Sequence, residues 1–318
     1  MHFLLDGDPG HDDMLTILLA AKHVEVVAIT TVHGNQSLEK TTINARKTVE
    51  LGGLQHIPIA RGLDRPLVNE PVYAPEVHGK TGLDGVELPD PVVPLSDLTA
   101  VEMIIAMSHE YDDLVIVATG PLTNVAAALR IDPTLAGRLA SISLMGGSLT
   151  FGNSTPAAEF NIWVDPEAAD IVFTSGIPLR MFGLNVTRQA AATVKELDRI
   201  RDLGTPFART IADLVEFYRA NLERVYGLKG ASLHDPLAIA TFIRPELFTM
   251  KPMHVGIELH GTRTRGMTVC DYRHATGESE LGGKNAVLRG EPANCDVAIG
   301  IDVEGFFDLL TDTLAMYA

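Results

Sequence analysis

The sequence is poor in cysteine and in basic residues. Its only cysteines are Cys270 and Cys295, too few for a disulfide framework, and this usage fits a reducing compartment. Lysine and arginine together number 25 against 41 aspartates and glutamates, so the formal net charge is −16. Nucleic-acid polymers and anionic membrane surfaces both require basic patches, and the composition therefore argues against them as partners. An uncharged nucleoside is still compatible with it.

Several familiar signals are also missing. No apolar run approaches the roughly 20 residues of a membrane span, and no secretory signal precedes Asp6, so we expect a cytoplasmic protein. The chain has no G-x-G-x-x-G and no G-x-x-x-x-G-K-[ST] motif, which leaves dinucleotide and P-loop nucleotide binding without support. The G-x-S-x-G nucleophile elbow is absent as well.

The most informative stretch is an acidic loop between two apolar runs. Apolar residues at 3–5 and 14–21 flank it, a pattern typical of a buried strand that leads into a buried helix. Two carboxylates about 5 Å apart repel by roughly 3 kcal/mol at an effective dielectric constant near 20, so a cluster needs a cation or shared protons. Oxygen-only donors favour a hard cation such as Ca²⁺ or Mg²⁺, although the glycine spacing does not fit an EF-hand. A solvated acidic turn that caps a helix is the alternative. The loop carries four carboxylates within eight positions: Asp6, Asp8, Asp12 and Asp13.

Strand-like and helix-like patterns alternate along the chain. β-branched runs such as 24–31, 114–118 and 141–145 are separated by helical patterns. This predicts an α/β fold with a mainly parallel, doubly wound sheet flanked by helices. We find no repeat and no flexible linker, and therefore expect a single domain over residues 1–318 with helical and loop insertions. The stretch at 62–97 is rich in proline and glycine and too long for a plain connection, so we interpret it as a functional segment or lid.

Polar residues follow the predicted strands where ligands bind in such sheets, outside the carboxyl ends. Asp8 follows the first strand, Asn35 the second, and Thr119 the strand at 114–118. We expect these loops to share one rim. The loop at 153–161 belongs to the same rim, and its amides and carboxylate suit a polyhydroxylated ligand, although such residues are also common in turns.

Two histidines are candidate proton donors near neutral pH. His234 stands in the sequence His234-Asp235-Pro236, directly before an apolar helical run. An aspartate cap on a helix with proline in its first turn is the simpler interpretation of Asp235, and a cation ligand is the functional one. His78 lies in the glycine-rich stretch, where a solvent-exposed loop histidine is the alternative. We expect Trp163 to lie in the core.

At residues 6–13 (DGDPGHDD) the chain resembles the N-terminal signature of the inosine-uridine-preferring nucleoside hydrolases. The resemblance continues in further blocks that follow the family's order, and an ordered set of this kind is far more specific than any single block. These blocks lie at residues 32–42, 78–85, 119–124, 145–147, 155–161 and 234–236.

The resemblance implies the nucleoside hydrolase fold and Ca²⁺-dependent hydrolysis of the N-glycosidic bond of ribonucleosides to ribose and free base, as in nucleoside catabolism and purine or pyrimidine salvage. It also implies a homo-oligomer, a dimer or a tetramer. The implied metal ligands are the carboxylates of Asp8, Asp13 and Asp235 and the backbone carbonyl of Thr119, with Asp8 also the general base and Asp6 supporting the ligands from behind. The implied contacts of the substrate are Asp12, Asn35, Asn153, Glu159 and Asn161 for the ribose, and His78 and His234 for the base, whose departure they would assist.

The resemblance leaves the preferred nucleobase open. Asn185 stands where the family often carries aspartate, and the region 218–226 is variable in the family. Purine-specific members stack the base on tryptophans, and Trp163 is the only tryptophan here. This favours a nonspecific or pyrimidine-preferring enzyme acting on uridine, cytidine or inosine.

Two other functions remain compatible with the residues. A strand followed by D-x-D also suits the aspartyl nucleophile and Mg²⁺ of a haloacid-dehalogenase-type phosphatase, although Pro9 and Gly10 follow directly and the other motifs of that family are not evident. A Ca²⁺-dependent nucleoside-binding protein without turnover is the non-enzymatic alternative.

Overall fold

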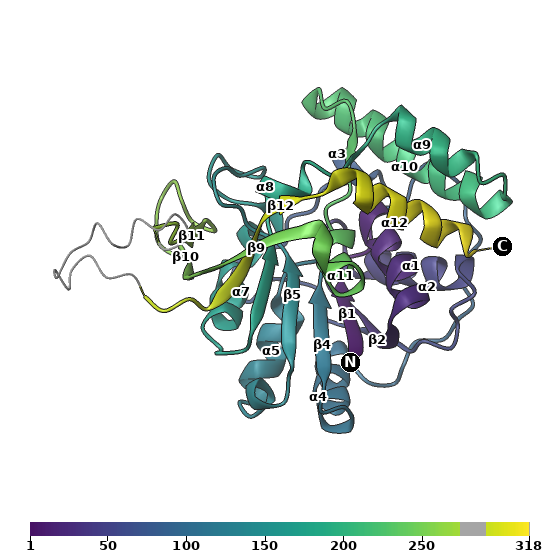
Figure 1. The fold of residues 1–318 in the computed structure, drawn as a ribbon. Coiled ribbons are helices and arrows are strands. Elements are labelled where there is room, and N and C mark those ends of the chain that lie inside the picture. Colours follow the sequence, from purple (N-terminus) through teal and green to yellow (C-terminus); the bar gives the residue numbers. More distant parts are fainter. Residues whose placement is uncertain (274–290, 318) are drawn as a thin grey trace.

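The computed structural model describes residues 1–273 and 291–317. Its centre is an eight-stranded sheet in the order β3-β2-β1-β4-β5-β6-β12-β9 (Figure 1). All neighbouring strands pair in parallel except β9, which runs antiparallel to β12. The predicted mainly parallel sheet is therefore confirmed. Its strands are β1 (His2–Gly7), β2 (Glu25–Thr31), β3 (Ile59–Arg61), β4 (Leu114–Ala118), β5 (Ser141–Met145), β6 (Leu179–Phe182), β9 (Phe248–Met253) and β12 (Cys295–Ile301).

Helices connect most of these strands, and two small antiparallel sheets lie outside the main one. The helices are α1 (His11–His23), α2 (Leu38–Leu51), α3 (Pro75–His78), α4 (Ala100–Glu110), α5 (Thr123–Ile131), α6 (Phe160–Val164), α7 (Pro166–Phe173), α8 (Leu184–Thr187), α9 (Val194–Arg201), α10 (Pro206–Tyr226), α11 (Pro236–Ile243) and α12 (Val303–Ala315), with 3-10 turns at Leu135–Gly137 and Pro245–Leu247. The small sheets pair β7 (Ala191–Ala192) with β8 (Ala231–Ser232) and β10 (Val255–Ile257) with β11 (Thr268–Cys270).

Strand β1 shows why helices cover both faces of the sheet. Successive side chains of a strand point to opposite faces. Phe3 and Leu5 enter a core shared with α1, α2, α10, α11 and α12. Leu4 between them enters a second core shared with α4, α5 and α7 (Figure 1). A strand buried on both sides is a continuous apolar run in the sequence, as β1 is at residues 3–5.

The chain changes direction across the sheet between β1 and β4. After β1 it builds β2 and β3 on one side, and it then returns to build β4, β5 and β6 on the other. Connections that diverge in this way leave a crevice at the carboxyl ends of the two central strands. Asp8 follows β1 and Thr119 follows β4, and the Thr119 N–H donates to the Asp6 carbonyl at 2.8 Å. The acidic loop therefore stands at this crevice.

Two insertions close over the crevice. The stretch at 62–97 contains one regular element, the short helix α3, and is otherwise irregular, as predicted. The long helix α10 starts at the capping residue Thr205 and ends at Gly227, whose φ of 70° is the left-handed conformation that glycine adopts freely. The Asn221 side-chain amide of α10 donates to the Val77 carbonyl of α3 at 3.2 Å, which joins the two insertions.

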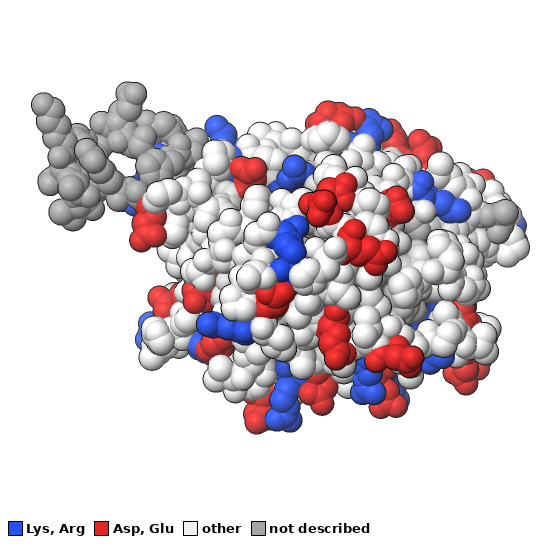
Figure 2. Space-filling view, turned by 90° about the horizontal axis from the view of Figure 1, so that it is seen from below, with Lys and Arg blue, Asp and Glu red and all other residues white. Residues whose placement is uncertain are grey.

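One face of the molecule carries side chains of both charges. On the face drawn in Figure 2, lysines and arginines are scattered among aspartates and glutamates, and no continuous basic patch is visible there. Among the helices of the described residues, none has the length and apolar character needed to span a membrane.

Candidate functional site

The loop after β1 and the first turn of α1 hold Asp8, Asp12 and Asp13. Gly10 caps the helix, and its N–H donates to Asp13 Oδ2 at 3.0 Å. The free N–H groups and the dipole of a helix start favour carboxylates in this turn. Asp8 is fully buried, and its Oδ2 accepts the Asn35 N–H at 2.6 Å. A Cβ on Gly120 would lie 2.6 Å from Asp8 Oδ1, so the loop after β4 packs directly against this carboxylate.

Asp235 joins these aspartates from a distant part of the chain. One carboxylate oxygen from each of Asp12, Asp13 and Asp235 lies within 4.8 Å of the others, and all three residues are buried. Asp8 is close enough for its negative charge to help raise the pKa of Asp235. The Asp235 side chain forms no capping hydrogen bond with α11, so the simpler interpretation as a helix cap is wrong for this side chain.

The cluster is electrostatically unsatisfied. Burial raises the pKa of Asp8, Asp13 and Asp235, and it raises that of Asp12 to about 7. Among the ion pairs formed by the described residues, none includes these four carboxylates. Asp8 Oδ1 and Asp12 Oδ1 are buried without a hydrogen-bond partner. Buried carboxylates are paired or bind metals, and this all-oxygen donor set therefore fits a hard divalent cation.

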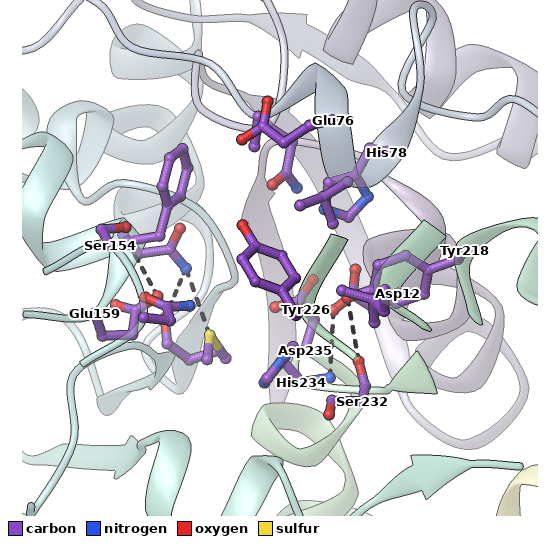
Figure 3. A pocket seen from close by; sticks show the side chains of 18 of the residues that line it. Asp12, Glu76, His78, Ser154, Glu159, Tyr218, Tyr226, Ser232, His234 and Asp235 are labelled. Atoms are coloured by element: carbon purple, nitrogen blue, oxygen red, sulfur yellow. Dashed lines mark hydrogen bonds between the residues drawn. The ribbon is translucent and has the colours of Figure 1, made fainter. Parts of the chain in front are cut away.

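A cavity of about 520 Å³ opens beside the cluster (Figure 3). Asp12, Thr119 and Asp235 line its acidic end. Asp8 and Asp13 do not line it. Asp13 Oδ1 accepts the Thr119 hydroxyl at 2.7 Å, and its Oδ2 accepts an amide hydrogen of Asn35 at 3.3 Å; both of these partners line the cavity. The structure nevertheless brings every other predicted contact of the substrate into this cavity: Asn35, His78, Asn153, Glu159, Asn161 and His234.

Glu159 and Asn161 are held rigidly in one wall. Glu159 caps α6, and its carboxylate accepts the N–H groups of Asn161 and Gly147, both at 2.9 Å. Burial raises the pKa of Glu159 to about 7. The Asn161 amide donates to the Thr119 carbonyl at 2.9 Å. A carbonyl oxygen has two lone pairs, so this bond leaves one of them for a cation. Asn153, by contrast, is exposed at the mouth of the cavity.

The two histidines lie in the opposite wall, where His78 is buried and His234 is half-buried. His234 donates its backbone N–H to Asp12 Oδ2 at 3.2 Å, and its ring Nδ1 lies 2.7 Å from the Thr187 hydroxyl. Burial, and then the charge of Arg188, lowers the pKa of His234 to about 3, so the ring enters a reaction at neutral pH uncharged. His78 is only 5% exposed, and the alternative of a solvent-exposed loop histidine is therefore wrong.

The sequence interpretation missed several residues at the cavity. Trp163 is only half-buried and lines the cavity, which corrects the expectation that it lies in the core. Arg188 also lines it, and no local pattern marks this residue. Tyr226, from the variable region 218–226, lines the cavity as well. His11, which received no role, is fully buried beside His78. Its place in the first turn of the buried helix α1, next to Asp12, was the available signal.

Asn185 and Asp6 support the site from outside the cavity. The Asn185 side chain accepts the Leu149 N–H at 3.3 Å and donates to the Ala298 carbonyl at 2.8 Å, which ties the loop after β5 to β12. Asp6 Oδ1 accepts the Thr30 hydroxyl at 2.6 Å and an Asn124 amide hydrogen at 2.8 Å. Neither residue lines the cavity, and their side chains join neighbouring segments of the fold.

Comparison with known proteins gives a consistent result. The family model described as inosine-uridine preferring nucleoside hydrolase matches residues 3–308. The pyrimidine-specific ribonucleoside hydrolase RihA of Escherichia coli O9:H4 (strain HS) is 44% identical over 319 residues, which cover 99% of this chain and 98% of that protein. A purine-preferring ribonucleoside hydrolase from Gardnerella vaginalis superposes with a TM-score of 0.89 at 34% identity, covering 100% of this chain and 99% of its own. A plant nucleoside hydrolase, PpNRh1, gives 0.90 at 32%, with 99% and 98% covered.

Proposed function

Because this chain belongs to the inosine-uridine preferring nucleoside hydrolase family and is a ribonucleoside hydrolase, we propose that it acts with a bound Ca²⁺ ion and prefers pyrimidine ribonucleosides. The observation that carries the proposal is the convergence of Asp12, Asp13 and Asp235 at one end of a cavity that is also lined by two histidines, at positions 78 and 234. The acids suit a cation and a positively charged sugar, and the histidines suit a departing base.

In this proposal the carboxylates of Asp8, Asp13 and Asp235 and the carbonyl of Thr119 hold the ion. When bound, Ca²⁺ would orient a water molecule and make it more acidic. Asp8 then takes a proton from the attacking water, a role supported by its complete burial and its unpartnered Oδ1. Asp12 shares the geometric cluster with Asp13 and Asp235 and lines the cavity, and we assign its carboxylate to the ribose.

The remaining wall binds the sugar. Asp12, Asn35, Asn153, Glu159 and Asn161 offer amides and carboxylates that can hold the ribose hydroxyls and fix the ring against the attacking water. Cleavage of the N-glycosidic bond leaves positive charge on the ribosyl group, and a carboxylate-rich cavity stabilises that charge as it develops. Contacts with hydroxyls remote from the breaking bond supply the binding energy for this positioning.

The base leaves on the side of the histidines. We assign His234 as the donor to the departing base. The Thr187 hydroxyl can donate to its Nδ1, and this would leave the ring proton on Nε2. The pyrimidine preference is supported by the name of the Escherichia coli relative, while the Gardnerella vaginalis relative is described as purine-preferring. Because Trp163 lines the cavity, the absence of a tryptophan at the base no longer argues for pyrimidines.

A panel of uridine, cytidine, inosine, adenosine and guanosine, scored for free ribose with Ca²⁺ present and after exhaustive chelation, tests the proposal. We expect release of ribose from uridine and cytidine above the purine nucleosides, and its loss on chelation. Faster release from inosine or guanosine would overturn the base preference. Binding without release of reducing sugar would identify a nucleoside-binding protein, and phosphate release from sugar phosphates would point to the phosphatase. Cytoplasmic location and self-association stay predictions.

A further inference from the structure

A chain of hydrogen bonds behind the cavity is not used by the proposed reaction. His11 Nε2 lies 2.8 Å from the backbone carbonyl oxygen of Asp84, and His11 Nδ1 lies 3.4 Å from His78 Nδ1. The centroids of the two rings are 5.7 Å apart, and the ring planes are inclined by 19°. The ring of Tyr218 packs against both, with centroid distances of 5.4 Å to His11 and 5.1 Å to His78.

The chemistry of these atoms decides where the protons lie. A carbonyl oxygen only accepts, so His11 must carry its hydrogen on Nε2. With that hydrogen on Nε2, the Nδ1 of an uncharged His11 ring is an unprotonated acceptor. The facing Nδ1 of His78 must donate, because two lone pairs would otherwise oppose each other. In a neutral His78 ring the remaining nitrogen, Nε2, therefore carries no hydrogen.

We propose that His11 is a positioning residue that holds His78 in the tautomer protonated on Nδ1, so that His78 presents a hydrogen-bond acceptor to the nucleobase. The inference deepens the proposed function and rests on it. The preferred substrates are then ribonucleosides whose base carries an N–H or amino group on the edge that faces His78, such as N3–H of uracil or the 4-amino group of cytosine. His78 cannot be the proton donor in this arrangement, and that role falls to His234.

The surroundings of the two rings support a fixed arrangement. A Cβ on Gly10 would lie 2.6 Å from His78 Nδ1, so the backbone of the acidic loop leaves this ring no room to turn away. The carbonyl that orients His11 belongs to Asp84, whose side chain accepts the N–H groups of Lys80 and Thr81 at 2.8 and 3.0 Å. These bonds close a tight loop after α3. His78 Nε2 forms no hydrogen bond with the described residues, and its ring lines the cavity.

The tautomer can be observed directly in the Ca²⁺-loaded enzyme. Long-range proton–nitrogen correlation NMR on protein labelled with ¹⁵N-histidine distinguishes a protonated from a bare ring nitrogen, and the spectrum of His78→Gln identifies the signals of His78. We expect a protonated Nδ1 and a bare Nε2 in His78. A proton on Nε2 of His78 in the unsubstituted enzyme would overturn the inference. This result needs no variant that changes the tautomer.

Two matched variants test the role of His11. His11→Phe keeps a ring against Tyr218 but removes both hydrogen bonds, and the His78 proton should then move to Nε2, since an N–H on Nδ1 would have no acceptor. The kcat/KM for uridine should fall about 3- to 10-fold relative to that for 4-nitrophenyl riboside, whose leaving group offers no N–H donor. Phe217→Leu alters the packing on the same His11 ring and leaves both hydrogen bonds in place. It should change neither the His78 tautomer nor the ratio of the two kcat/KM values.

The outcomes separate this inference from the proposed function. Absence of nucleoside hydrolysis would refute the function, and the NMR spectrum would still report the tautomer. Normal hydrolysis of uridine with His78 protonated on Nε2 would refute only the inference. An unchanged His78 tautomer in His11→Phe would also refute it. If that variant does not fold, the spectrum of the unsubstituted enzyme decides alone.

Discussion

Removing the divalent ion should reverse the way in which stability depends on pH. A carboxyl group whose pKa is higher in the folded than in the unfolded protein stabilises the fold below its unfolded pKa, and this contribution is lost as pH rises through the folded pKa. Burial raises the pKa of Asp12 from 3.8 to about 7, and it raises those of Asp8, Asp13 and Asp235 as well. The metal-free protein should therefore lose stability between about pH 4 and pH 7.

The size of the effect follows from the shift. The pKa of Asp12 rises from 3.8 to about 7. At about 1.4 kcal/mol for each pKa unit, a rise of about three units costs on the order of 4 kcal/mol once that group ionises in the metal-free fold. A cation that binds only the folded protein stabilises it by about 2.7 kcal/mol in total at a hundredfold excess over its dissociation constant, and relief of the ionisation cost is one part of that dissociation constant. Asp6 and Glu159 have pKa values raised to about 6 and about 7, and their pH-dependent contribution to stability is common to the metal-free and the Ca²⁺-loaded protein.

Urea unfolding of stripped and Ca²⁺-loaded protein, each measured near pH 5 and near pH 7.5, gives the relevant free energies of unfolding. The stabilisation by Ca²⁺ should be several kcal/mol larger at the higher pH. Asp235→Asn should abolish most of this difference. Asp165→Asn, which alters a buried aspartate that caps α7 outside the cluster, should leave it intact. Equal stabilisation at the two pH values, or stripped protein that becomes more stable as pH rises, would refute the reasoning.

Three further changes have defined outcomes. Asp8→Asn should lower kcat for uridine by about 10²- to 10⁴-fold with a normal circular dichroism spectrum, since it removes the proposed general base, and near-normal turnover would remove Asp8 from that role. His234→Ala should reduce kcat/KM for uridine far more than for 4-nitrophenyl riboside, and equal losses would mean that His234 is not the donor. Asn185→Ala should lower the melting temperature and leave the ratio of uridine to inosine hydrolysis unchanged, because its bonds join the loop after β5 to strand β12 outside the cavity; a changed ratio would contradict this.

The fold was predictable because its signals are local. All five residues of β4 are fully buried, and their run of apolar side chains already indicates this burial in the sequence. Strands that alternate with helices permit few arrangements other than a parallel sheet with helices on both faces. The antiparallel edge strand β9 has no such local signal, since its direction depends on pairing with β12 across the segment that includes residues 274–290.

The sequence predicted which residues form the candidate site, but not how they are arranged in space. The four aspartates of residues 6–13 carried their own signal, since unpaired carboxylates are seldom buried. Asp235 carried no such signal, because capping of a helix explained an aspartate at this position equally well. The structure shows that its side chain forms no capping hydrogen bond and lies in the cluster. Trp163 was misplaced for a related reason. A helix pattern indicates which face is apolar, but it does not show whether that face meets the core or the wall of a cavity.

By itself the sequence determined the alternation of strands and helices, the acidic loop between β1 and α1, and the blocks that identify a ribonucleoside hydrolase. Only the tertiary structure decided that Asp235 meets Asp12 and Asp13, that burial raises the pKa values of all three, and that His11 holds His78. The physical reason is the sequence separation over which each interaction acts. Backbone hydrogen bonding and the burial of one strand or helix follow from neighbours in the chain, whereas desolvation and the position of a proton depend on groups that folding brings together from distant segments.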